Sequence, residues 1–181
     1  AADYHRLMQS IRDAVPGVAI TTDVMVGFPG ETEEEFATSY RFIEEQEFAG
    51  IHVFPYSIRH RTTASKLPNQ VGPEEKHRRT EAMLALAARS AARFRQRFLG
   101  QVVPVLYEGS TRTKDGSLTW EGLTDNYLRV RVESDIALTN QVVATRLEAC
   151  AEDGIRGILL GPVPEIRQAG ADLNILSAAS R

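Results

Sequence analysis

The spacing of apolar side chains divides the first 56 residues into four predicted elements. From Asp3 to Val15 apolar residues recur at near-helical intervals, which predicts a helix that Pro16-Gly17 ends. Residues 18–26 are almost wholly apolar or β-branched, which predicts a parallel strand buried on both faces. A second amphipathic stretch over 32–47 and a short apolar run over 51–56 predict a helix and another strand. This order is a βαβ unit with a preceding helix.

Two parallel strands are too few to bury both faces of a sheet, so the predicted sheet is incomplete. Either it is the remaining part of a larger (β/α) barrel, or another copy of the chain completes it as a homo-oligomer. Residues 57–72 form a polar loop, and Pro73 with Glu74 and Glu75 marks the start of a helix that runs to about Phe98.

From Gln101 the period changes to two, which is typical of strands exposed on one face. Five short strands are predicted, separated by turn sequences such as Asp-Gly and Thr-Asp-Asn. Their ranges are 102–108, 118–122, 127–133, 141–147 and 155–160. So many short strands in a row predict a small antiparallel OB-like barrel.

The predicted architecture is therefore α/β followed by β. Residues 1–98 form the α/β part with its linker helix 73–98, residues 99–161 form the barrel, and residues 162–181 form a loose tail. In the third predicted strand, alternation places Leu128, Val130 and Val132 in the core and directs Tyr127, Arg129 and Arg131 outward.

The distribution of charge is uneven although the net charge is only -3. Residues 1–58 hold 3 basic and 10 acidic side chains, and residues 59–97 hold 10 basic and 3 acidic ones. The basic middle segment could meet a polyanion locally, or it could be a solvated helix with arginines on its outer face.

Cys150 is the only cysteine, so the chain can form neither an internal disulfide nor a cysteine cluster for a metal. No apolar run approaches the roughly 20 residues of a membrane helix, and no signal peptide opens the sequence. These features favour a cytoplasmic protein without a membrane partner.

The turn at residues 27–32, Gly-Phe-Pro-Gly-Glu-Thr, is the first candidate for chemistry. Its spacing matches neither a P-loop nor the dinucleotide glycine fingerprint. Gly27 and Gly30 allow backbone amides to approach a ligand closely, and the carboxyl ends of parallel strands are where α/β folds bind ligands. The alternative is a tight structural turn before a helix capped by Thr32 and Glu35.

Three stretches together resemble the radical S-adenosylmethionine tRNA methylthiotransferases. They are the run from Thr21 to Glu31, the run His52-Val-Phe-Pro-Tyr-Ser-Ile-Arg59, and Thr62-Thr-Ala64. The second is most similar to the branch that methylthiolates C2 of N6-threonylcarbamoyladenosine beside the tRNA anticodon. The run Thr124-Asp-Asn-Tyr-Leu-Arg-Val130 resembles the TRAM RNA-binding domain of these enzymes.

The resemblance implies S-adenosylmethionine and two 4Fe–4S clusters as cofactors and tRNA as the partner of the full-length enzyme. The cysteines that hold both clusters lie upstream in the family, so the chain resembles the C-terminal part and is expected to be inactive alone. The residues implied to border S-adenosylmethionine are Asp23, Gly27, Phe28, Pro29, Gly30, Glu31, Phe54, Pro55 and Tyr56. Asp23 could equally be a paired structural acid.

The resemblance also implies RNA contacts from Arg59 and Arg61 in the loop and from Tyr127, Arg129, Arg131 and Trp120 on the barrel. A single tryptophan in a small barrel could instead be core, and the loop arginines could be merely solvated. The sequence departs from the family at Arg61 and Asn140, where glycines are expected. Two other functions stay open: a non-catalytic RNA-binding module, and an inactive relative whose barrel contacts only protein.

Overall fold

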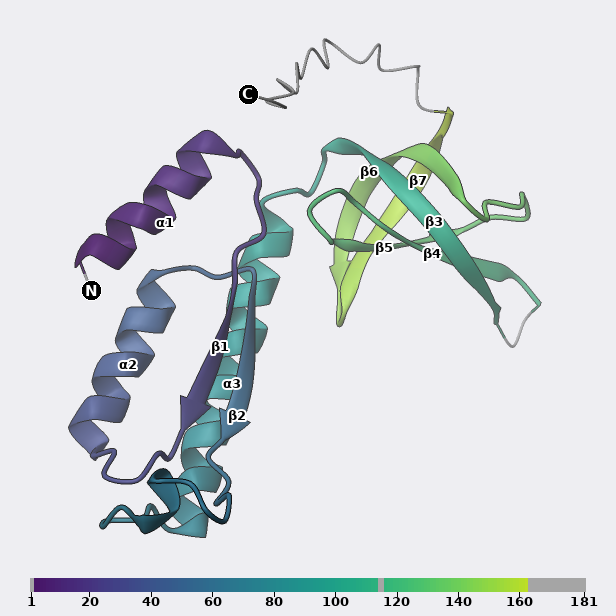
Figure 1. Ribbon diagram of the computed structural model, residues 1–181. Coiled ribbons are helices and arrows are strands. Elements are labelled where there is room, and N and C mark those ends of the chain that lie inside the picture. Colours follow the sequence, from purple (N-terminus) through teal and green to yellow (C-terminus); the bar gives the residue numbers. More distant parts are fainter. Residues whose placement is uncertain (1, 114–115, 163–181) are drawn as a thin grey trace, which may run out of the picture.

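The computed structural model describes residues 2–113 and 116–162, which form an α/β unit and a β-barrel joined by one long helix (Figure 1). The predicted tail 162–181 lies, apart from its first residue, outside the described residues. The α/β unit contains α1 (Ala2–Ala14), β1 (Thr21–Val26), α2 (Glu33–Glu45), β2 (Gly50–Pro55) and a 3-10 helix (Ala64–Lys66). The long helix is α3 (Pro73–Gln96). The barrel contains β3 (Val102–Arg112), β4 (Leu118–Leu123), β5 (Arg129–Glu133), β6 (Gln141–Ala151) and β7 (Gly154–Pro162).

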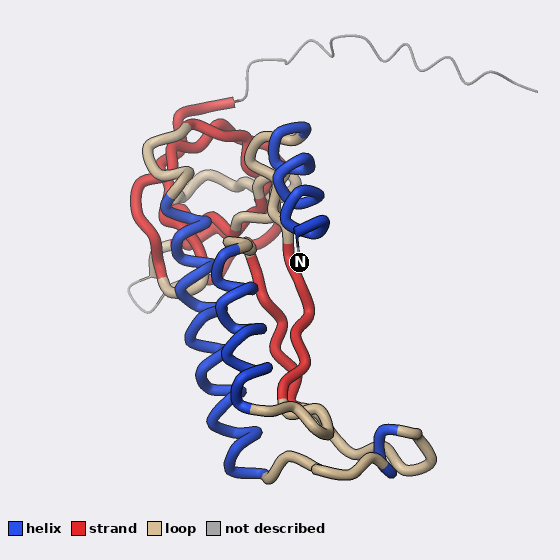
Figure 2. Tube along the Cα trace, turned by 90° about the vertical axis from the view of Figure 1, so that its left-hand side faces the viewer, coloured by secondary structure: helices blue, strands red, loops and turns tan. Residues whose placement is uncertain are grey.

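Strands β1 and β2 are parallel, as the βαβ pattern predicts, with Thr21 opposite Gly50 and Val26 opposite Pro55. Helices α2 and α3 both cover the same face of this two-stranded sheet, as Figure 2 shows in profile. The core between them contains Val26 and Ile51 from the sheet and Phe36, Met83 and Leu86 from the helices.

The opposite face of the sheet is open, so the prediction that β1 is buried on both faces is wrong. Thr21, Asp23 and Met25 alternate along β1 as exposed residues, while Val26 is buried. Met25, the apolar member of this set, therefore has no covering partner among the described residues.

Helix α2 begins at the predicted capping box. Thr32 Oγ1 accepts a hydrogen bond from the Glu35 amide, and the Glu35 carboxylate accepts one from the Thr32 amide at 2.8 Å. The bond from the Thr32 backbone lowers the pKa of Glu35. In α1 only Met8 is buried; Leu7 of this helix and Val15, which follows it, are exposed.

The barrel closes in the order β3-β4-β5-β7-β6, which is the five-stranded topology of an OB-like barrel. The expectation of a wholly antiparallel barrel is wrong at one pair, because β5 and β7 run parallel. This pairing follows from the chain path: β6 and β7 form an antiparallel hairpin, and β7 then closes against β5.

Alternation along β5 is confirmed, with Leu128 just before the strand and Val130 and Val132 within it all buried. The barrel core also holds Tyr107, whose hydroxyl lies 2.9 Å from Thr145 Oγ1. Burial raises the pKa of Tyr107 to about 12.

The barrel sits at the amino ends of β1 and β2, away from their carboxyl ends (Figure 1). Asn126 Nδ2 donates a hydrogen bond to Gly17 O at 2.8 Å, and Ala19 and Ala49, which precede the two strands, pack against the barrel core. Phe94 near the end of α3 belongs to the same core. One helix therefore supports the sheet along its length and the barrel at its end.

Candidate functional site

The turn at the carboxyl end of β1 is closed by its own hydrogen bonds. The Gly27 amide donates to Glu31 Oε2 at 2.7 Å, and the Glu31 amide donates to Phe28 O at 2.9 Å. The Gly30 amide donates to Asn69 O at 2.8 Å. The expectation that the glycines present free amides to a ligand is therefore wrong for Gly27 and Gly30, whose left-handed φ angles of 73° and 89° serve the turn itself.

Glu31 also receives a buried arginine that the sequence did not single out. Arg79 of α3 is 4% exposed, and its Nη1 donates to Glu31 Oε2 at 2.7 Å and to Glu31 O at 3.0 Å. Its Nε donates to Glu75 Oε1 at 2.7 Å. A charge-assisted network thus ties the turn to the long helix.

Glu75 is the most strongly perturbed carboxylate of this network. Hydrogen bonds from Arg78 and then Arg79 lower the pKa of Glu75 from 4.5 to about 2. Because this folded-state pKa lies below the ordinary value, the stabilisation is fully present above pH 4.5 and is lost as the pH falls towards 2.

We expect the urea midpoint of the chain to fall between pH 5 and pH 2.5, and Glu75→Gln to flatten this dependence. The matched control is Glu81→Gln, at an exposed position further along α3. Equal pH profiles for the two variants would contradict the prediction.

Beside the turn, Phe28 lies edge-on to Tyr56 with ring centroids 5.3 Å apart. The Tyr56 ring is buried, its amide donates to Val26 O at 2.8 Å, and its carbonyl accepts from Lys76 Nζ at 3.3 Å. Pro29 is buried, and Pro55 is exposed at the end of β2. Tyr56 therefore has neither a free ring nor free backbone groups for an adenine, whereas Phe28 keeps part of its ring exposed.

The open face of the sheet carries the exposed polar and aromatic side chains that are free to contact a ligand. Asp23 lies opposite His52, and Met25 lies opposite Phe54, in the parallel register. All four are exposed, with Met25 at 55% and Phe54 at 50%. A carboxylate, an imidazole and an aromatic ring on one uncovered surface can bind a ligand that has both a cationic and a planar part. His52 was missed as a site residue because its partner on β1 is visible only in the register.

Two positions at which the family has glycine keep a glycine-like backbone: Arg61 in the loop after β2, and Asn140 just before β6. Arg61 and Asn140 both have left-handed φ angles, of 71° and 57°. Asparagine tolerates this conformation, but for arginine it costs about 1–2 kcal/mol. Arg59 and Arg61 are both exposed in this loop.

We expect Arg61→Gly to stabilise the chain by about 0.5–1 kcal/mol, because relief of this strain exceeds the entropy cost of glycine. Arg59→Gly is the control, since Arg59 is not among the residues with positive φ. A thermal melt in which Arg61→Gly is the less stable of the two would refute the argument.

On the barrel, the predicted RNA contacts separate into three groups. Tyr127 is 80% exposed and has a left-handed φ of 62°. Arg129 and Arg131 share Glu121, at 2.7 and 2.9 Å, and Arg131 also pairs with Asp153. Trp120 is 4% exposed, and its Nε1 donates to Ser134 O at 3.1 Å. The prediction of a stacking face on Trp120 is wrong, because its ring lies within the barrel core.

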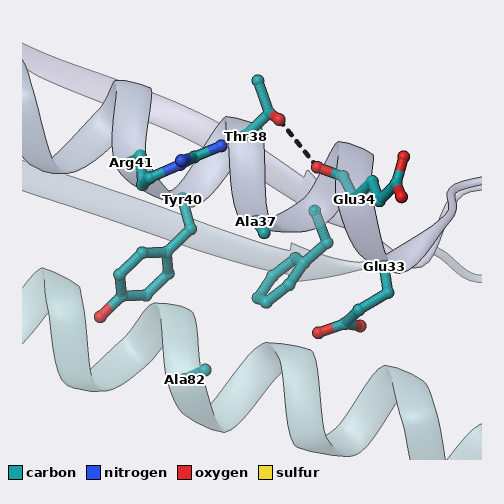
Figure 3. Close-up of a pocket in the computed structure, with 8 residues that line it drawn as sticks. Glu33, Glu34, Ala37, Thr38, Tyr40, Arg41 and Ala82 are labelled. Atoms are coloured by element: carbon teal, nitrogen blue, oxygen red, sulfur yellow. Dashed lines mark hydrogen bonds between the residues drawn. The ribbon is translucent and has the colours of Figure 1, made fainter.

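A groove of about 670 Å³ lies between α2 and α3 (Figure 3). In Figure 3 the side chains of Tyr40 and Glu33 lie on the side of α2 that faces α3, where Ala82 lies, and Glu34, Thr38 and Arg41 lie along the other side of α2. This groove is on the helical side, so it is separate from the open face of the sheet.

No family model matches the sequence. Several curated relatives do. A threonylcarbamoyladenosine tRNA methylthiotransferase, MtaB of Bacillus subtilis, is 34% identical over 140 residues, which are 77% of this chain and 31% of the relative. A tRNA-2-methylthio-N(6)-dimethylallyladenosine synthase of Acetivibrio thermocellus is 35% identical over 158 residues, 87% of this chain and 32% of the relative. A synthase of the same name from Thermobifida fusca is 43% identical over 116 residues, which are 64% of this chain and 24% of the relative.

The chain is a homologue of the tRNA methylthiotransferases. This confirms the resemblance drawn from the sequence. The homologue spans about a third of the length of the first two relatives named here.

The residues of this methylthiotransferase homologue do not suit an iron–sulfur cluster, which cysteine thiolates hold. Cys150 is its only cysteine, and within residues 2–113 and 116–162 no three His, Cys, Asp or Glu side chains gather as metal ligands. S-adenosylmethionine fits better, because Asp23 and Phe54 offer an anion and a ring on the same open face. Within the same described ranges, no helix is long and apolar enough to cross a membrane.

Proposed function

We propose that this chain is the C-terminal part of a radical S-adenosylmethionine tRNA methylthiotransferase. In this proposal residues 1–98 are the last segment of the (β/α) barrel that binds S-adenosylmethionine, and residues 99–161 are the TRAM domain that binds tRNA. Two 4Fe–4S clusters, held by cysteines upstream of this chain, would supply the radical and the sulfur.

The open face of β1 and β2 is the observation that carries the proposal. In a (β/α) barrel the helices lie outside and the uncovered strand face lies inside, and here both α2 and α3 cover one face only. The inner positions are then Asp23, Met25, His52 and Phe54. The Phe54 ring would stack on the adenine, and the Asp23 carboxylate would pair with a positive charge of the cofactor.

Tyr127 is the strongest candidate for contact with RNA on the barrel, because an exposed ring can stack on an unpaired base. Arg129 and Arg131 are held by Glu121 and Asp153, so their charge is largely balanced before any phosphate arrives. In this proposal they contact RNA phosphates only if these ion pairs open. Within residues 2–113 and 116–162, Arg59 and Arg61 are exposed without a carboxylate partner, so they offer free positive charge nearer the turn.

N6-threonylcarbamoyladenosine is the substrate we propose, on the strength of the His52–Arg59 stretch and the Bacillus subtilis relative. The second candidate is N6-dimethylallyladenosine, favoured by the names of the other two relatives. The two differ in the group on N6, so the modified nucleosides differ in mass.

The test is to express the full-length protein that contains this chain in a bacterium lacking its own methylthiotransferases. We expect mass spectrometry of digested tRNA to detect 2-methylthio-N6-threonylcarbamoyladenosine. If only the 2-methylthio-N6-dimethylallyladenosine product is detected, the second substrate is the correct one. If a soluble, cluster-containing protein gives neither product, the enzyme proposal is rejected.

A non-catalytic RNA-binding module is the rival function. Iron–sulfur absorption in the purified full-length protein supports the enzyme, whereas tRNA binding without that absorption supports the module. In either case, a tRNA affinity that does not fall with rising salt would contradict phosphate-driven binding.

A further inference from the structure

Arg79 occupies a position from which it can control the turn at the carboxyl end of β1. It lies in α3, 48 residues after Glu31, and it bonds both the side chain and the main chain of Glu31. The same Glu31 oxygen accepts the Gly27 amide at 2.7 Å. The carboxylate held by this buried guanidinium therefore fixes the start of the turn at Gly27, while backbone bonds from the Gly30 and Glu31 amides hold the rest.

Glu75 fixes Arg79 in turn. Its Oε1 accepts Arg79 Nε at 2.7 Å, and Arg79 lies against the Phe36 ring with its guanidinium carbon 5.4 Å from the ring centroid. The guanidinium is thus surrounded by Glu31, Glu75, the Phe36 ring and, at 3.4 Å from its Nη2, the carboxylate of Glu33. A lysine lacks the planar fork that makes these contacts together.

We propose that Arg79 is a positioning residue for S-adenosylmethionine, acting through Glu31 on the turn that follows β1, next to Met25 and Phe54 at the carboxyl end of the open face. This inference rests on the proposed function and adds a residue outside the turn to the machinery of cofactor binding. Arg79 itself touches no ligand in this account, since its side chain is buried behind Glu31.

The neighbouring Arg78 provides a matched control. It also pairs with Glu33 and Glu75, but it is exposed and, within the described part of the chain, makes no bond to Glu31. Arg78→Lys and Arg79→Lys each keep a positive charge on the same helix, one residue apart. Only Arg79→Lys removes the guanidinium bonds to Glu31.

The experiment measures the Kd for S-adenosylmethionine by equilibrium dialysis and kcat for tRNA methylthiolation, using the full-length protein. We expect Arg79→Lys to raise this Kd about tenfold, because charge-assisted bonds are lost, and to change kcat less than about twofold at saturating cofactor. Arg78→Lys should change the Kd less than about twofold. A uniform effect of both variants, or a loss of kcat alone, would overturn the inference.

Glu31→Gln gives an independent test through coupling. If Arg79 acts through Glu31, the double variant Glu31→Gln with Arg79→Lys should bind the cofactor no more weakly than the weaker single variant. Additive losses would contradict this route. Folding of each variant is checked by far-ultraviolet circular dichroism and a thermal melt.

Should Arg79→Lys fail to fold, the comparison passes to Glu31→Gln against Glu34→Gln, with the same expected tenfold difference in Kd, because Glu34 is exposed on α2. Equal Kd values for those two variants would reject the inference. If the unsubstituted protein binds no S-adenosylmethionine, the proposed function fails instead, so the two failures are distinguishable.

Discussion

Replacing Trp120 with alanine is expected to destabilise the barrel by about 3–5 kcal/mol, the usual cost of deleting a buried aromatic side chain. The ring is 4% exposed, packs with Val132 and Leu138 in one core, and donates from Nε1 to Ser134 O. The substitution opens a cavity and leaves the Ser134 carbonyl without its donor, and both changes lower the free energy of unfolding.

Urea denaturation followed by circular dichroism measures this effect. Tyr127→Ala is the control, because an 80% exposed side chain contributes little to folding. It should change stability by less than about 0.5 kcal/mol. A loss of stability of less than about 1 kcal/mol for Trp120→Ala would contradict its place in the core.

The same two variants separate folding from RNA binding. Tyr127→Ala should weaken tRNA binding by about 1–3 kcal/mol while leaving the barrel folded, because stacking on a base has about that worth. Filter binding at one fixed salt concentration checks it. Unchanged affinity would remove Tyr127 from the proposed RNA surface.

Replacing Gly27 with alanine is expected to cost about 2–4 kcal/mol. Its φ of 73° is unfavourable for a residue with a Cβ, and a Cβ at this position would lie 2.3 Å from Lys76 Cγ. The Lys76 side chain would have to move, which breaks the bond from its Nζ to Tyr56 O.

Gly30→Ala is the matched control for the crowding. Its φ is also left-handed, at 89°, but a Cβ there meets nothing within 4 Å. We expect a loss of only about 1–2 kcal/mol from the backbone alone. Equal losses of stability for the two variants in thermal melts would show that the Lys76 side chain moves aside at no cost.

The order of elements was predictable from the sequence because each has a local signal. The capping box at Thr32 and Glu35 marks the start of α2, and the change of period after Gln101 marks the start of the barrel. The alternation of Leu128, Val130 and Val132 likewise follows from residues close together in the chain.

The remaining features depend on contacts between distant residues. Arg79 and Glu31 are 48 positions apart, and nothing near either one indicates the other. The pairing of Arg131 with Asp153 turns a predicted phosphate contact into a balanced ion pair in the same way. The exposure of Met25 and Phe54 is unpredictable for a different reason, because their apolar character is the same in a covered and an uncovered strand.

The placement of the barrel at the amino ends of the strands has a consequence for the size of any shared ligand. Each strand of the sheet has six residues, which corresponds to a span of about 20 Å. A molecule that touches Tyr127 and also reaches the Gly27 turn must extend over that whole span. An isolated nucleoside can occupy one end only, so under the proposed function a folded RNA can contact both ends at once and its fragments cannot.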